Sequence, residues 1–114
     1  MNIGILGAGS FGEKHINVIK HINDFNIIGF FDPNKERAKS IEKKYQIKSF
    51  RSEKELIDQC DAIDIVSSTE THYKLLQLGI QNNKHIFIEK PICCQHADIL
   101  QLLQTTKTYK PIIQ

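Results

Sequence analysis

The chain has 114 residues, of which 40% are hydrophobic and 25% charged, the composition of one globular domain rather than of a disordered chain. Its net charge of +2 is too small to indicate nucleic-acid binding, and its basic residues are interspersed with acids as on solvated helix faces. No apolar stretch approaches the roughly 20 residues of a membrane span, and the first residues do not resemble a signal peptide, so we expect a soluble, cytoplasmic protein.

Apolar runs and amphipathic runs alternate along the whole chain. The apolar runs predict strands at Asn2–Leu6, Asn26–Phe31, Lys48–Phe50, Ala62–Val66, Lys84–Ile88 and Pro111–Ile113. The amphipathic runs predict helices at Phe11–His21, Lys35–Lys44, Ser52–Gln59, Thr71–Asn82 and His96–Thr106. Such alternation predicts one α/β domain over residues 1–114 with a parallel sheet covered on both faces. Right-handed crossovers and two mononucleotide-like halves make it a three-layer, doubly wound Rossmann fold with strand order 3-2-1-4-5-6.

A glycine motif lies between the first predicted strand and the first predicted helix. It reads Gly7-Ala8-Gly9-Ser10-Phe11-Gly12, and Asp32 ends the second strand twenty positions beyond the last glycine. A lone GxGxxG is a weak signal, because glycine turns that merely join a strand to a helix are common. With a strand before it, a helix after it and the acid in place, the motif predicts a dinucleotide-binding βαβ unit.

Each residue type in the motif has a physical role in that interpretation. Gly7 allows the tight turn, Gly9 lets the backbone approach a pyrophosphate, and Gly12 lets the helix pack closely on the strand. The N–H groups around Ser10, Phe11 and Gly12 are expected to point at the phosphates, with the positive end of the helix dipole behind them.

The acid after the second strand bears on the choice of cofactor. Asp32 is placed to accept both hydroxyls of an adenosine ribose and to repel a 2′-phosphate, so we expect NAD, with NADP second. Lys35 and Arg37 lie close enough in sequence to soften this preference.

The three cysteines do not indicate a metal site or a disulfide framework. Cys60, Cys93 and Cys94 form no CxxC pair, and an odd count fits a reducing compartment. Cys93, Cys94 and His96 are crowded into four positions without a second cluster, which is not zinc-ligand spacing. We therefore expect no metal and interpret this stretch as a loop between a strand and a helix.

Two further stretches complete a family pattern. One is Ala62-Ile63-Asp64-Ile65-Val66-Ser67-Ser68-Thr69-Glu70-Thr71-His72, and the other is His85-Ile86-Phe87-Ile88-Glu89-Lys90-Pro91. Together with the glycine motif and His15, three positions past it, they resemble the amino-terminal domain of the Gfo/Idh/MocA family, named for glucose–fructose oxidoreductase and inositol dehydrogenase. The resemblance covers essentially the whole chain, and Glu-Lys-Pro in register with the glycine loop is a fairly specific combination.

The resemblance implies that Lys90 lies beside the nicotinamide and the reacting carbinol, where it orients substrate and handles a proton. Glu89 and Lys90 then belong to the cofactor site, and the Lys90–Pro91 bond is expected to be cis. The chemistry is sound, because a hydride leaves a secondary alcohol only as its O–H proton is handed over. The alternative is an exposed lysine before a turn proline.

The loop after the fourth predicted strand departs from the family's usual Thr-Pro-Asn or Thr-Pro-Thr. Ser67, Ser68 and Thr69 occupy these places, which implies a less rigid loop that keeps hydroxyl groups near the nicotinamide ribose. The resemblance places His72 in the wall of the cofactor pocket, and the alternative is a histidine that caps or packs the first turn of a helix. His15 is left open between a packing histidine and a group on the cofactor side.

Family members continue into a second α/β domain, which supplies substrate contacts and most of an oligomer interface. The resemblance therefore implies the cofactor-binding half of an NAD(P)-dependent oxidoreductase acting on a secondary alcohol of a sugar, cyclitol or nucleotide-sugar, with a homo-oligomer as one arrangement. A stand-alone, non-enzymatic NAD(H)-binding module or subunit is the alternative. A Rossmann-like methyltransferase is disfavoured, because Glu89-Lys90-Pro91 would then have no role.

Overall fold

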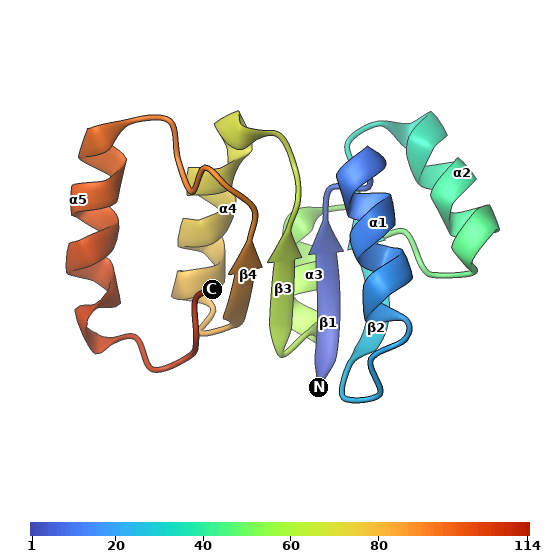
Figure 1. Cartoon of the computed structure of the whole chain (residues 1–114), viewed down its shortest axis with the longest axis horizontal. Helices are drawn as coiled ribbons and strands as arrows, with labels where there is room; N and C mark the ends of the chain where they lie inside the picture. The colour runs from blue at the N-terminus through green and yellow to red at the C-terminus, as the bar shows by residue number, and fades with distance from the viewer.

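The computed structural model describes residues 1–114 and contains a four-stranded parallel sheet with helices on both faces (Figure 1). The strands are β1 (Asn2–Leu6), β2 (Asn26–Phe31), β3 (Ala62–Ile65) and β4 (His85–Ile88), in the order β2-β1-β3-β4. The helices are α1 (Ser10–Ile19), α2 (Lys35–Tyr45), α3 (Glu53–Gln59), α4 (Thr69–Gln81) and α5 (His96–Thr105), followed by the 3-10 turn η1 (Thr106–Thr108). None of these helices combines the length and apolar character that crossing a membrane requires.

The prediction of six strands is wrong, because both predicted edge strands are reduced to single parallel bridges. At the β2 edge, Ser49 pairs with Phe30 alone, and the chain turns at once toward the start of α3. At the β4 edge, Ile113 pairs with Ile86 alone. The four central strands do lie in the predicted order, and the two bridged segments flank them on the predicted sides.

On its carboxyl side the pairing at the β4 edge continues, because the Ile88 N–H donates to the Gln114 carbonyl at 3.0 Å, and on its amino side it ends for a local reason. Pro111 has no N–H to donate to a ladder. The Ile112 N–H donates to the Nδ1 atom of His85 at 3.2 Å, which is a side-chain contact rather than a strand contact. The Lys90–Pro91 peptide bond between β4 and α5 is cis, as expected.

The sheet separates two apolar cores. On the face covered by α1 and α2, the core residues are Ile5, Ala8, Ile16, Phe30, Ala38, Ile41, Tyr45 and Val66. On the face covered by α3, α4 and α5, they are Leu6, Phe50, Leu56, Ile57, Cys60, Ile63, Ile65, Leu75, Leu76, Ile86, Ile88 and Leu102. Side chains alternate along a strand, so β3 directs Ile63 and Ile65 to the second core and Asp64 to the α1 side.

Helix starts differ in how their free N–H groups are satisfied. The side chain of Asn34 accepts from the Arg37 N–H at 2.9 Å to begin α2, and Ser52 Oγ accepts from the Glu55 N–H at 3.2 Å to begin α3. The first turns of α1, α4 and α5 have no side-chain cap. Those of α1 and α4 lie at the carboxyl edge of the sheet, and their N–H groups without a partner can meet a ligand there, whereas the Thr71 N–H of α4 donates to the Ser68 carbonyl at 2.9 Å.

Leu56→Ala is expected to destabilise the domain strongly. The Leu56 side chain is fully buried against β1, where Gly4 leaves room for it. Removing it leaves a cavity and should lower the free energy of unfolding by about 2–5 kcal/mol, measured by chemical denaturation. Leu100→Ala on the exposed side of α5 is the matched control and should change it by less than about 0.5 kcal/mol. Equal losses in the two variants would contradict the assignment of the core.

Candidate functional site

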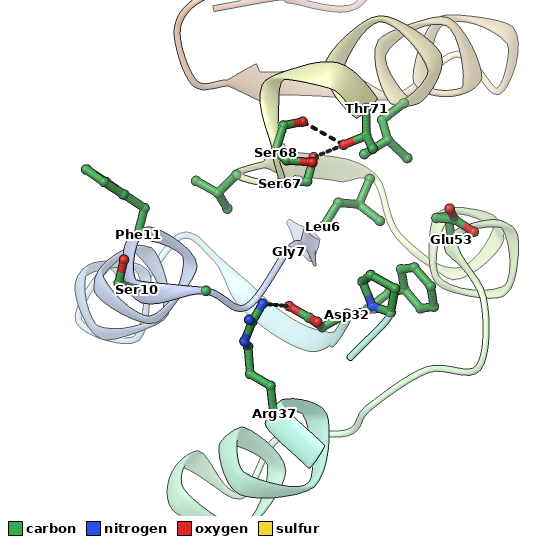
Figure 2. A pocket seen from close by; sticks show the side chains of 15 residues that line it. Leu6, Gly7, Ser10, Phe11, Asp32, Arg37, Glu53, Ser67, Ser68 and Thr71 are labelled. Carbon is green, nitrogen blue, oxygen red and sulfur yellow. Dashed lines mark hydrogen bonds and ion pairs between the residues drawn. The ribbon is translucent and has the colours of Figure 1, made fainter. Parts of the chain in front are cut away.

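A cleft of about 450 Å³ opens at the carboxyl ends of β1, β2 and β3 (Figure 2). It is lined by Leu6, Gly7, Gly9, Ser10, Phe11, Phe31, Asp32, Pro33, Arg37, Glu53, Val66, Ser67, Ser68, Thr71 and Leu75. The strand order reverses between β1 and β3, and the crevice outside such a switch point is where open α/β sheets bind ligands.

The glycine loop forms one wall of the cleft, and its three glycines have different surroundings. A Cβ at Gly7, whose φ is +102°, would lie 2.7 Å from the backbone of Ser67. A Cβ at Gly12 would lie 2.1 Å from the carbonyl oxygen of Gly7. A Cβ at Gly9 would meet only the Arg37 Nη1 atom, at 3.9 Å, so this position faces open space. Gly7 and Gly12 are therefore required for close backbone packing within the domain, whereas Gly9 leaves room for a ligand.

Asp32 joins the glycine loop to the start of α2. Its Oδ2 atom accepts from the Ala8 N–H at 2.8 Å and from Arg37 Nη1 at 3.2 Å, and its Oδ1 atom accepts from the Asn34 N–H at 2.8 Å. The carboxylate is buried, whereas the guanidinium of Arg37 reaches over it from α2 and is half exposed (Figure 2). The predicted acid thus lines the cleft, with a cation beside it.

The opposite wall is a cluster of hydroxyl groups at the start of α4. The hydroxyls of Ser67 and Thr71 are 2.7 Å apart, and the Thr71 hydroxyl donates to the Ser68 carbonyl at 2.8 Å (Figure 2). Of the predicted residues, Ser67 and Ser68 line the cleft, and Thr69 begins α4 without lining it. Thr71 lines it in addition.

His72 lies beneath this loop rather than in the cleft wall. It is fully buried, with Nδ1 2.8 Å from the Pro91 carbonyl oxygen and Nε2 3.1 Å from the Ser67 carbonyl oxygen. Both neighbours are backbone carbonyl oxygens, and the tautomer of the ring decides which of the two nitrogens donates. His72 therefore connects the start of α4 to the segment after β4.

His15 lies outside the cleft, on the side of α1 that faces the sheet. Its Nδ1 atom is 2.9 Å from Asp64 Oδ2 and its Nε2 atom is 3.2 Å from Glu89 Oε1. The hydrogen bond with Asp64, helped by the charges of both carboxylates, raises the pKa of His15 against the opposing effect of burial. Burial in turn raises the pKa of the Asp64 carboxyl, and the His15 ring works against that shift.

The Glu-Lys-Pro segment comes directly after β4 at the same edge of the sheet. The Glu89 N–H donates to the Ile65 carbonyl at 3.0 Å, which ties the segment to the end of β3. The second carboxylate oxygen of Glu89, Oε2, accepts from the Lys90 N–H at 3.2 Å. Lys90 is exposed, and its ammonium forms no ion pair within the chain.

Sequence reasoning did not foresee every residue that meets in the cleft. The sequence indicates Arg37 only as a charge near Asp32, and it does not single out Glu53 or Thr71. Thr71 had a signal, since it is four residues after Ser67, one helical turn away once α4 begins at Thr69. Glu53 had none, because α3 reaches the cleft only through the folding of the crossover from β2 to β3.

The comparison with protein families settles what kind of domain this is. The sequence pattern of the GFO_IDH_MocA family, described as "Oxidoreductase family, NAD-binding Rossmann fold", matches residues 1–114. The chain belongs to this family. The glycine loop, Asp32 and the Glu89-Lys90-Pro91 segment are thus parts of a Gfo/Idh/MocA NAD-binding domain.

Relatives and solved structures agree with this assignment. The chain is 32% identical over 110 residues to the myo-inositol 2-dehydrogenase of Thermotoga maritima, covering 94% of this chain and 33% of that protein. It is 33% identical over 102 residues to the UDP-N-acetylglucosamine 3-dehydrogenase of Acidithiobacillus ferrooxidans, covering 88% and 32%. A structure of the latter superposes with a TM-score of 0.89 at 28% identity, over 99% of this chain and 38% of that one. The chain therefore spans about a third of the length of the relatives it matches.

Gly9→Ala is expected to leave the fold intact and to weaken dinucleotide binding. Gly9 has a φ of −67°, which alanine adopts readily, and its Cβ would enter open space on the ligand side. Calorimetric titration should show roughly tenfold or more lower affinity for NAD, a loss of about 1.4 kcal/mol. Gly12→Ala is the contrasting variant, because its Cβ would clash with the Gly7 carbonyl and should lower the melting temperature. Wild-type NAD affinity in a folded Gly9→Ala domain would exclude this place for the ligand.

Proposed function

We propose that this domain is the cofactor-binding half of a nicotinamide-dependent oxidoreductase that acts on a secondary alcohol of a sugar, cyclitol or nucleotide-sugar. The observation that carries the proposal is the cleft at the β1–β3 switch point, with Lys90 at the end of the next strand along the same edge. The named relatives include a myo-inositol dehydrogenase and a UDP-N-acetylglucosamine dehydrogenase, whose substrates are of these classes.

The residues of the cleft fit a dinucleotide. The uncapped first turn of α1 offers free N–H groups and the positive end of a helix dipole to a pyrophosphate, and Gly9 leaves the space for its approach. The hydroxyls of Ser67 and Thr71 offer hydrogen bonds on the opposite wall. When bound, the nicotinamide would accept or donate the hydride.

Asp32 favours NAD in this proposal, with Arg37 as a moderating influence. A carboxylate at the end of β2 accepts ribose hydroxyls and repels a 2′-phosphate. The guanidinium of Arg37, 3.2 Å from Asp32, partly offsets that repulsion and could itself contact a phosphate. Because the carboxylate is directly linked to the glycine loop through Ala8, we assign it the larger influence.

Lys90 would act on the substrate in this proposal. Its ammonium is exposed and free of ion pairs, so it can donate a hydrogen bond to the substrate oxygen while the O–H proton is transferred. The Glu89 carboxylate contacts the backbone N–H of Lys90, and His72 contacts the carbonyl oxygen of Pro91, so both restrain the backbone that presents Lys90. The matched relatives are about three times as long as this chain, and the remaining substrate contacts would come from the part of the protein that corresponds to the rest of their length.

NAD is expected to bind more tightly than NADP to the unmodified chain. Arg37→Ala should lower the affinity for NADP more than the affinity for NAD, because it removes the cation that lies beside Asp32. Lys35→Ala is the matched control, since Lys35 is on the same helix but outside the cleft. Calorimetric titration of both cofactors measures the effect, and tighter binding of NADP by the wild type would overturn the preference.

The 114-residue chain alone is expected to bind dinucleotide and to show little or no dehydrogenase activity. Its cofactor cleft is formed, but misplacing reacting groups by even ~1 Å can cost about a hundredfold in rate. Binding and NAD reduction should be measured on one preparation across a panel of sugars, inositols and nucleotide-sugars. Robust turnover would refute the half-site proposal, and failure to bind any dinucleotide would refute the proposed function.

A further inference from the structure

His15 is the one side chain that contacts two carboxylates from different elements. It projects from α1 and lies between Asp64 on β3, at 2.9 Å, and Glu89 just after β4, at 3.2 Å. An ionised carboxylate only accepts hydrogen bonds, so both contacts are satisfied together only when both ring nitrogens carry a proton. The geometry therefore favours the imidazolium form, flanked by two negative charges.

The Asp64 carboxylate depends on this contact. Its side chain is only 1% exposed, and its Oδ1 atom has no hydrogen-bond partner. Burying an ionised carboxylate is costly unless it is paired and hydrogen-bonded, and the His15 ring supplies the pairing. Loss of the charge on His15 would leave Asp64 with a single neutral donor.

The Glu89 carboxylate connects the His15 ring to the backbone of Lys90. One of its oxygens accepts from His15 and the other accepts from the Lys90 backbone N–H at 3.2 Å. On the other side of Lys90, the Pro91 carbonyl oxygen lies 2.8 Å from Nδ1 of His72, which is on α4. The segment that presents Lys90 is thus held by two histidines, each from a helix whose first turn borders the cofactor cleft.

We propose that His15 is a positioning residue for Lys90, which it holds through Glu89 and thereby joins to the helix that carries the glycine loop. The role of Lys90 rests on the proposed oxidoreductase function, whereas the connection from His15 to the Lys90 backbone does not. His15 has no contact with the cleft and is not itself a catalytic residue.

The surroundings of His15 make the connection sensitive to pH. The charged groups that face the ring are Asp64 from β3 and Glu89 from the end of β4, while Phe87 of β4 lies 5.9 Å from it, centroid to centroid. The cavity beside the ring is otherwise lined by Ile3, Val18, Ile19, Ile22, Phe25 and Gln114, none with a titratable side chain. On α1 itself, the neighbouring cation Lys14 lies over Phe11.

The sign of the effect comes from the raised pKa of His15. A group that binds its proton more tightly in the folded state contributes its full stability below its unfolded pKa, ordinarily 6.5, and loses it as pH rises through the folded value. While the carboxylates are ionised, the contact with Glu89 should therefore be complete at pH 6.5 and should weaken as pH rises through the raised pKa of His15.

Nuclear magnetic resonance on the full 114-residue chain tests the proposal. The imidazole of His15, assigned by its loss in His15→Gln, should titrate with a midpoint above 6.5. The backbone amide of Lys90 should shift with the same midpoint, and this step should vanish in His15→Gln. His21→Gln, which removes an exposed histidine just beyond the end of the same helix, is the matched control and should leave both steps in place.

A second variant keeps the test decisive if His15→Gln does not fold. Glu89→Gln should lower the His15 midpoint and abolish the shared step at Lys90. A Lys90 amide that does not follow His15 in the wild type, or that keeps its step in either variant, would overturn the proposal. Titrating NAD into the same samples separates the two ideas, because failure to bind would refute the proposed function while the shared midpoint still decides the role of His15.

Discussion

The close approach of the glycine loop to the end of β3 is the constraint on which the rest of the site depends. Gly7 has no Cβ, so the loop can lie directly against the backbone of Ser67, and Gly12 lets α1 begin against the Gly7 carbonyl. This contact brings the first turns of α1 and α4 to opposite walls of one cleft (Figure 2). A larger residue at either position would push these walls apart, whatever groups they carry.

Polar groups are buried where loops from different strands must be held in place. Asp32, Asp64 and His72 are the buried polar side chains of this domain. Asp32 connects the glycine loop to α2, Asp64 is linked through His15 to α1, and His72 connects α4 to the segment after β4. Since a buried polar group is costly unless it is hydrogen-bonded, each of these contacts restricts the two segments that it joins to one relative position.

Local sequence patterns predicted the central part of the fold well and its edges poorly. β1 and β2 lie at their predicted bounds, because continuous apolar runs between turn residues admit few other structures. The edge segments at Ser49 and Ile113 are apolar enough to suggest strands, yet each pairs at one position. Whether an edge segment pairs along its length depends on its partner strand and on the direction in which the chain leaves it, and a short apolar run encodes neither.

The sequence by itself determined the family, the glycine loop and the acid of the cleft, because Gly7, Gly9 and Gly12 act through backbone geometry and Asp32 follows them at a fixed spacing. Only the tertiary structure decided the partners of His15 and His72, since a histidine can cap, pack, bind a ligand or join two carboxylates. His15 meets Asp64 and Glu89 across 49 and 74 positions of the chain. Contacts at such separations arise from how parallel strands are ordered in the sheet, and no local pattern encodes them.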